Sequence, residues 1–69
     1  MTRDEFTRRF RAATEGLNVR LVASRLRTSL PTVERWRAGD SAPHRFAREN
    51  IIELALKLRR DVLGDGSVE

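Results

Sequence analysis

The stretch "VRLVASRLRTSLPTVERWRAG", residues 19–39, contains two short apolar patterns separated by a few polar residues. The first pattern places apolar residues at i, i+3, i+4 and i+7, the spacing of one helix face: Val19, Val22, Ala23 and Leu26. The second has Val33 and Trp36 three residues apart and then Gly39, a residue type common just past helix ends. The stretch therefore predicts two short helices in close succession.

Capping residues indicate where these two helices begin. Asn18 and Ser29 each precede a pattern, and both residue types favour the N-cap position. Pro31 suits the first turn of the second helix, where a backbone N–H has no acceptor within the helix. The connection is only about three residues long, which forces a sharp crossing, and the small Ala23 allows close packing there ten residues before Val33. This spacing predicts a helix-turn-helix.

One further helix is predicted on each side of this pair. Thr2 and Glu5 have the spacing of a capping box, and Gly16 is placed to end the first helix. The apolar stripe of that helix consists of Phe6, Phe10, Ala13 and Leu17.

The last predicted helix, residues 44–63, carries two neighbouring apolar stripes. The stripe expected to face the core consists of Ile51, Leu54, Ala55, Leu58 and Val62. The other consists of Ile52, Leu56 and Leu63. Two stripes exceed what one small core needs, so we predict that Ile52, Leu56 and Leu63 form a dimer seam. The alternative is that these residues complete the monomer core. A disordered tail is predicted over 64–69.

Length and composition restrict the fold and the chemistry. With 69 residues and no period-two alternation, the expected fold class is all-α, a compact domain of four or five helices over residues 1–63. The chain has no cysteine and one imidazole, His44, so we expect no disulfide, metal site, cofactor or enzymatic activity. No apolar run resembles a signal peptide or a membrane span, so a soluble cytoplasmic protein is expected.

Positive charge is concentrated in the middle of the chain. The net charge is +4, and residues 18–48 hold seven arginines against Glu34 and Asp40. Nearly all the positive charge is guanidinium, which matches phosphate and guanine edges bidentately. A genome rich in G·C would also favour arginine over lysine, but it does not explain the central excess.

Residues 19–39 resemble the helix-turn-helix of the lambda-repressor/Cro-like (xenobiotic-response-element type) DNA-binding family, and residues 43–58 are more loosely similar. The matching packing positions are Val22, Ala23, Leu26, Val33 and Trp36, and "TVERW…G" matches the recognition helix and its end. The sequence departs from the family at Arg27, where glycine is usual, at Thr28, usually apolar, at Val19, commonly glutamine, and at Arg37, often acidic.

The resemblance implies that the second helix of the motif lies in the major groove of DNA. Its candidate base-reading residues are Ser29, Leu30, Pro31, Thr32 and Arg35. Arg35 is the foremost, since bidentate arginine–guanine pairing is the commonest specific contact, although it could instead pair with Glu34 or Glu53. Leu30 and Pro31 could contact thymine methyl groups, or serve the core and the helix start. Ser29 and Thr32 could reach phosphate or cap the helix.

Candidate phosphate-binding residues flank the same surface, namely Asn18, Arg20, Arg37, Arg45 and His44. Arg25, Arg27 and Arg48 could equally form a solvated face. Trp36 could stack on a base, but its spacing from Val33 favours the core.

The resulting hypothesis is a sequence-specific regulator of transcription that binds double-stranded DNA, a small bacterial or phage repressor. A homodimer on a pseudo-palindromic operator would have half-sites about 34 Å apart. Two alternatives remain: a helical protein-interaction module of the antitoxin or adaptor type, which the apolar Leu30-Pro31 favours, and a sequence-neutral nucleic-acid binder.

Overall fold

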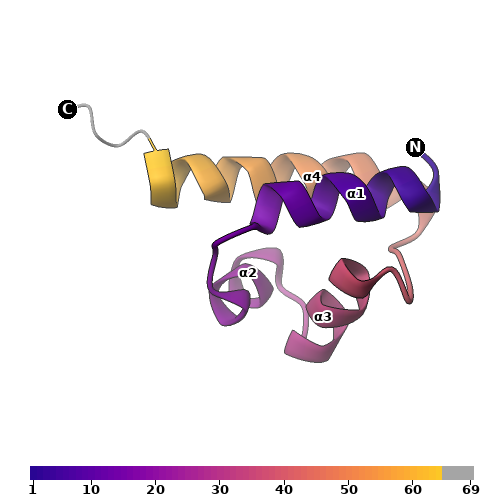
Figure 1. Cartoon of the computed structure of the whole chain (residues 1–69), viewed down its shortest axis with the longest axis horizontal. Coiled ribbons are helices and arrows are strands. Elements are labelled where there is room, and N and C mark those ends of the chain that lie inside the picture. The colour runs from indigo at the N-terminus through magenta and orange to yellow at the C-terminus, as the bar shows by residue number, and fades with distance from the viewer. Residues whose placement is uncertain (65–69) are drawn as a thin grey trace.

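The computed structural model describes residues 1–64, which form four α-helices and a closing π-helical turn. The elements are α1 (Arg3–Thr14), α2 (Val19–Leu26), α3 (Leu30–Ala38), α4 (Arg45–Arg59) and η1 (Arg60–Gly64) (Figure 1). No strand occurs in this part of the chain, and the prediction of a compact all-α fold is confirmed. Apart from Gly64, the predicted tail lies outside the described residues.

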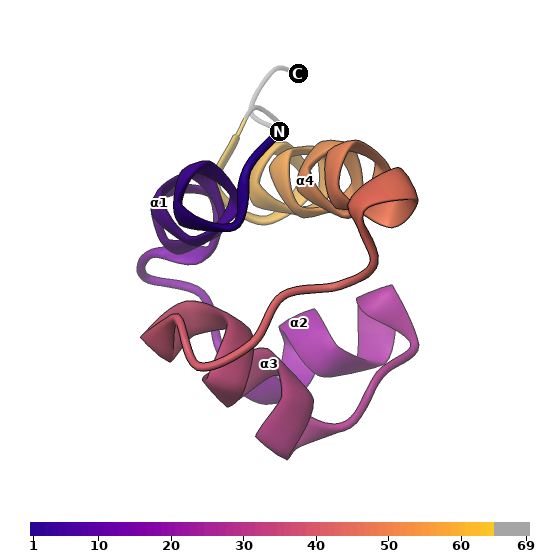
Figure 2. The ribbon, with the colours of Figure 1, turned by 90° about the vertical axis from the view of Figure 1, so that its right-hand side faces the viewer.

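The helices form two layers. In one layer α1 and α4 lie side by side and run in the same direction, and α2 and α3 form the other (Figures 1 and 2). The core fills the space between the layers and consists of Phe6, Phe10, Ala13, Leu17, Val22, Ala23, Leu26, Val33, Trp36, Ile52, Ala55 and Leu58. All five residues predicted as packing positions of the motif lie in this core.

Three aromatic rings fix α3 against α1. The rings of Phe6 and Phe10 are stacked with centroids 5.2 Å apart. Trp36 meets both rings edge-on, at centroid distances of 5.9 and 5.6 Å. Such edge-to-face pairs add to the stabilisation that burial already provides. Trp36 is therefore a core residue, as its spacing from Val33 indicated.

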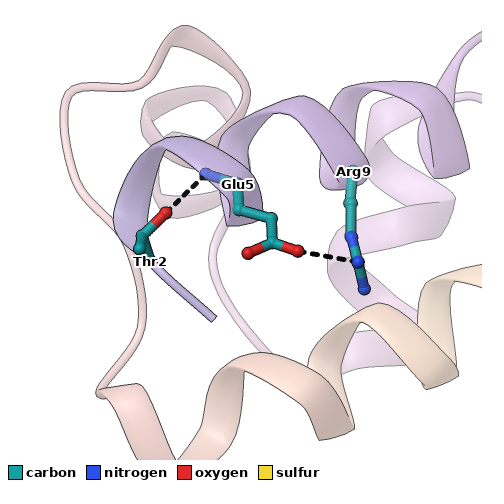
Figure 3. A network of polar contacts seen from close by, with 3 residues as sticks. All are labelled: Thr2, Glu5 and Arg9. Atoms are coloured by element: carbon teal, nitrogen blue, oxygen red, sulfur yellow. Dashed lines mark hydrogen bonds and ion pairs between the residues drawn. The ribbon is translucent and has the colours of Figure 1, made fainter.

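The start of α1 uses half of the predicted capping box (Figure 3). The backbone N–H of Glu5 donates to Thr2 Oγ1 at 3.1 Å. The Glu5 carboxylate forms an ion pair with Arg9 at 2.7 Å, one turn further along the helix, rather than a bond back to the cap. Because this pair is largely exposed, we expect it to contribute little to stability.

The two stripes predicted on the last helix do not match its buried face. Ile52 is buried and belongs to the monomer core, which is the alternative that the sequence left open for it. Leu54 and Val62, predicted as core, are 41% and 46% exposed. The reason is that α1 contacts α4 on one side and α2 contacts it on the other, so the buried face of α4 is the one centred on Ala55. Leu56 remains exposed.

The turn between α2 and α3 forces a non-glycine residue into the left-handed region. Arg27 has φ +57° and ψ +46°, and its N–H donates to the carbonyl of Ser24. The N–H of Thr28 donates to the carbonyl of Ala23 at 2.9 Å. These two bonds form a Schellman C-cap, whose left-handed position is usually glycine. Gly39, with φ +86°, occupies the equivalent position after α3.

Replacing Arg27 with glycine is expected to raise the free energy of unfolding by about 0.5–1 kcal/mol, because glycine adopts a left-handed conformation without steric cost. The measurement is urea unfolding followed by far-UV circular dichroism. Arg27→Ala is the matched control, since it removes the same charge but keeps a Cβ at the strained position. Equal stabilities of the two variants would contradict the prediction.

Candidate nucleic-acid interface

The α2–turn–α3 unit presents one face of α3 to solvent. Val33 and Trp36 anchor the inner face of α3, and Trp36 contacts rings of α1. Helical geometry places residues 31 and 35 on the opposite face, and both Pro31 and Arg35 are exposed. The outer face of α3 thus carries a guanidinium and an apolar ring on a rigidly packed helix.

Arg35 is available for a partner outside the chain. Among residues 1–64 it forms no hydrogen bond or ion pair, so neither Glu34 nor Glu53 engages it. The alternative of an intramolecular ion pair is therefore not realised in the structure. Leu30 is half-buried, whereas Pro31 is exposed.

Ser29 and Thr32 are engaged in starting α3. Ser29 Oγ accepts a hydrogen bond from the Thr32 N–H at 3.3 Å, and the two hydroxyl oxygens lie 2.8 Å apart. Of the two roles that the sequence left open for this pair, the structure shows the capping role. Both remain next to the outer face of α3, since they occupy its first turn.

The residues predicted to bind phosphate divide into two groups. Asn18 and Arg20 lie at the start of α2, where Asn18 Oδ1 accepts from the Arg20 N–H at 2.8 Å. His44 and Arg45 lie at the start of α4, in the other layer (Figure 2). His44 Nδ1 accepts from the Phe46 N–H at 3.2 Å. The fold therefore does not bring the second group onto α3.

Arg37, a candidate phosphate-binding residue, lies between the inner and outer faces of α3. It is half-buried, and its Nε is buried without a hydrogen-bond partner in the part of the chain described. Its side chain lines a groove of about 680 Å³ between α1, α3 and the start of α2, together with Arg11, Ala12, Glu15, Val19, Glu34 and Ala38. The Arg37 carbonyl accepts a hydrogen bond from Arg11 Nε.

Several arginines outside α2 and α3 hold the fold together. Arg3 donates to the Asp40 carbonyl at 2.9 Å, and Arg59 donates to the Glu15 carbonyl at 2.6 Å. Arg48 donates to the carbonyls of Pro43 and Met1, so its predicted solvated role is replaced by a structural one. The sequence missed these contacts, because the residues they join are mostly 37 to 47 positions apart and no local pattern marks them.

Phe46 is a second feature that the sequence prediction missed. Its side chain is 80% exposed, the most exposed large apolar side chain of the described residues. The His44 ring lies 5.0 Å from it, and the Arg45 guanidinium lies 5.2 Å from its centroid. An aromatic residue next to the apolar stripe of a helix is normally predicted to be buried, so nothing in the sequence indicated that Phe46 is exposed.

The side chains of the arginines in α2, the turn and α3 form no hydrogen bond or ion pair within residues 1–64. They include Arg20, Arg25, Arg27 and Arg35. Residues 18–39 contain five arginines and one glutamate, a net charge of +4, which equals the net charge of the whole chain. The rest of the chain is therefore neutral, and all the excess positive charge lies on the α2–α3 layer.

Searches for similar proteins yielded nothing: no family model, curated protein or solved structure matches the chain. None of the helices over residues 1–64 is long and apolar enough to cross a membrane. Over the same residues, no three His, Asp or Glu side chains gather where a metal ion could bind.

Proposed function

We propose that this protein is a sequence-specific regulator of transcription that binds double-stranded DNA with α3 in the major groove. The observation that carries the proposal is Arg35, a guanidinium without a partner among residues 1–64, on the outer face of a helix fixed to the core by Trp36. A planar fork held on a rigid helix matches the O6 and N7 atoms of guanine. Pro31, exposed one turn earlier, would contact a thymine methyl group.

Backbone contacts would come from the charged surface around α3. Arg20, Arg25 and Arg27 are exposed and unpaired in the described chain, so binding a phosphate breaks no contact within the protein. The start of α2, capped by Asn18, adds backbone N–H groups that favour an anion. Each phosphate neutralised adds affinity that decreases with salt.

Repression is the regulatory effect that we propose. It requires only that the protein occupy its operator, and no chemistry on DNA is involved. The cytoplasm, with the nucleoid as the bound location, is the proposed site of action.

A protein-interaction module is the second candidate, favoured by the exposed apolar surfaces of Pro31 and Phe46. The concentration of unpaired arginines on α2 and α3 argues for DNA instead, because an apolar partner would have to desolvate them. The two candidates differ in their salt dependence and in whether a preferred DNA sequence exists.

The first test is selection from a randomised duplex library at about 150 mM salt. The affinity for the enriched sequence is then measured between about 50 and 200 mM salt, because phosphate contacts weaken strongly over this range. We expect one enriched motif and an affinity that falls with a slope of about −0.9 per phosphate contacted. Binding without an enriched motif would indicate a sequence-neutral binder. Absence of binding at every salt concentration would leave the protein-interaction module.

A further inference from the structure

The outer side of the α1–α4 layer has an apolar groove next to exposed leucines. The groove measures about 390 Å³ and is lined by Arg9, Ala12, Ala13, Ile52, Leu56 and Arg59. Neither α2 nor α3 contributes to this lining, so the groove opens away from them. Leu56, at its edge, is 41% exposed, and Leu63 further along is 55% exposed.

The two charges that line this groove are already used within the chain. Arg9 is paired with Glu5, and Arg59 donates to the Glu15 carbonyl. The remaining lining is aliphatic. A groove of this kind fits an aliphatic side chain, and Leu56, which lines it, is exposed enough to enter the groove of a second copy.

Charges on α4 and on the first residue of η1 make part of the same face complementary to itself. The acidic Glu49 and Glu53 precede Leu56, and the basic Arg60 follows it, all exposed and without an ion-pair partner in residues 1–64. In an antiparallel pair related by a twofold axis between positions 56 and 57, Glu53 of each copy faces Arg60 of the other. Twofold interfaces require this kind of self-complementarity.

We propose that a second copy of this chain docks on the outer α1–α4 face, with the two α4 helices antiparallel and Leu56 at the centre. Leu56 of each copy packs against the groove of the other. The Glu53–Arg60 pairs on both sides of the centre set the register.

This arrangement has a consequence for DNA that rests on the proposed function. Arg35 lies on the side of α3 that faces away from the α1–α4 layer, because Trp36 contacts α1. Docking through the outer α1–α4 face therefore directs the two α3 helices to opposite sides of the dimer. Such a dimer binds two separate duplex segments and brings them together, in place of the single pseudo-palindromic operator expected from the sequence.

Charge exchange tests the dimer without DNA. The wild-type chain, Glu53→Arg, Arg60→Glu and the double variant are compared by sedimentation equilibrium. We expect each single variant to weaken the dimer about tenfold, because two symmetric attractions become repulsions, and the double variant to recover wild-type affinity. Leu56→Lys should be monomeric with an unchanged circular dichroism spectrum. A monomeric wild type, or a double variant no tighter than the single ones, overturns the proposal.

Co-capture tests the bridging. A bead-bound duplex carrying the selected motif is incubated with the protein and a second, fluorescent duplex. The wild type should retain the fluorescent duplex, and Leu56→Lys should bind the bead-bound duplex without retaining it. A dimer that binds the first duplex but never captures the second overturns the opposed arrangement. A dimer that binds neither duplex overturns the proposed function but does not contradict the α4 interface.

Discussion

Phe10→Ala is expected to lower the free energy of unfolding by about 3–5 kcal/mol, the usual cost of truncating a buried aromatic residue. Phe10 has no exposed surface and contacts the rings of both Phe6 and Trp36. Its removal leaves a cavity between α1 and α3 that the remaining rings cannot fill. Since a core of this size rarely supplies more than about 3–5 kcal/mol, most of the variant should be unfolded at 37 °C.

The measurement is urea unfolding followed by the fluorescence of Trp36, the only tryptophan. Phe46→Ala is the matched control, because it removes the same side chain from a position that is 80% exposed, and it should change stability by less than about 0.5 kcal/mol. A Phe10→Ala variant as stable as Phe46→Ala would show that the aromatic cluster does not hold the two layers together.

The second large effect concerns DNA. Arg35→Ala is expected to cost about 1–3 kcal/mol of affinity for the selected motif, roughly 5- to 150-fold, since each 1.4 kcal/mol corresponds to tenfold. The loss should be confined to sequences with a G·C pair at one position, because a bidentate contact distinguishes that pair from the others. Fluorescence anisotropy on a set of duplexes with single substitutions measures both the loss and its position.

Three further variants separate base reading from charge. Arg35→Lys keeps the charge but loses the planar fork, so it should retain the salt slope and lose much of the preference. Arg20→Ala should weaken binding equally for all sequences and lower the salt slope by about one. Arg8→Ala removes an exposed arginine of α1 and should do neither. If Arg35→Ala matches Arg8→Ala, α3 does not read bases through Arg35.

Local interactions explain why much of the fold could be predicted from the sequence. The caps at Thr2, Asn18 and Ser29 each satisfy a backbone N–H two or three residues away. Gly39 adopts the positive φ that ends α3, and Gly16 adopts a positive φ in the turn that follows α1. Because these contacts span only a few residues, the sequence contains both partners side by side.

The candidate site could be predicted where helical periodicity determines the direction in which a side chain points. Val33 and Trp36 fix the inner face of α3, and a residue two positions after Val33 must then lie outside, which places Arg35. Periodicity did not decide Arg37, which lies between the two faces. Its exposure depends on the groove that α1 forms with α3, which the Arg37 side chain lines.

On α4 the sequence determined a helix with a broad apolar face, and only the tertiary structure decided which part of that face is buried. Ile52 and Leu54 are equivalent in hydrophobicity and almost adjacent in sequence, yet one is in the core and the other is exposed. The reason is physical: burial on a helix with apolar residues over a wide arc depends on the directions from which its neighbours approach. Here α1 and α2 approach from the two sides of Ala55, and that geometry leaves Leu56 free on the outer face.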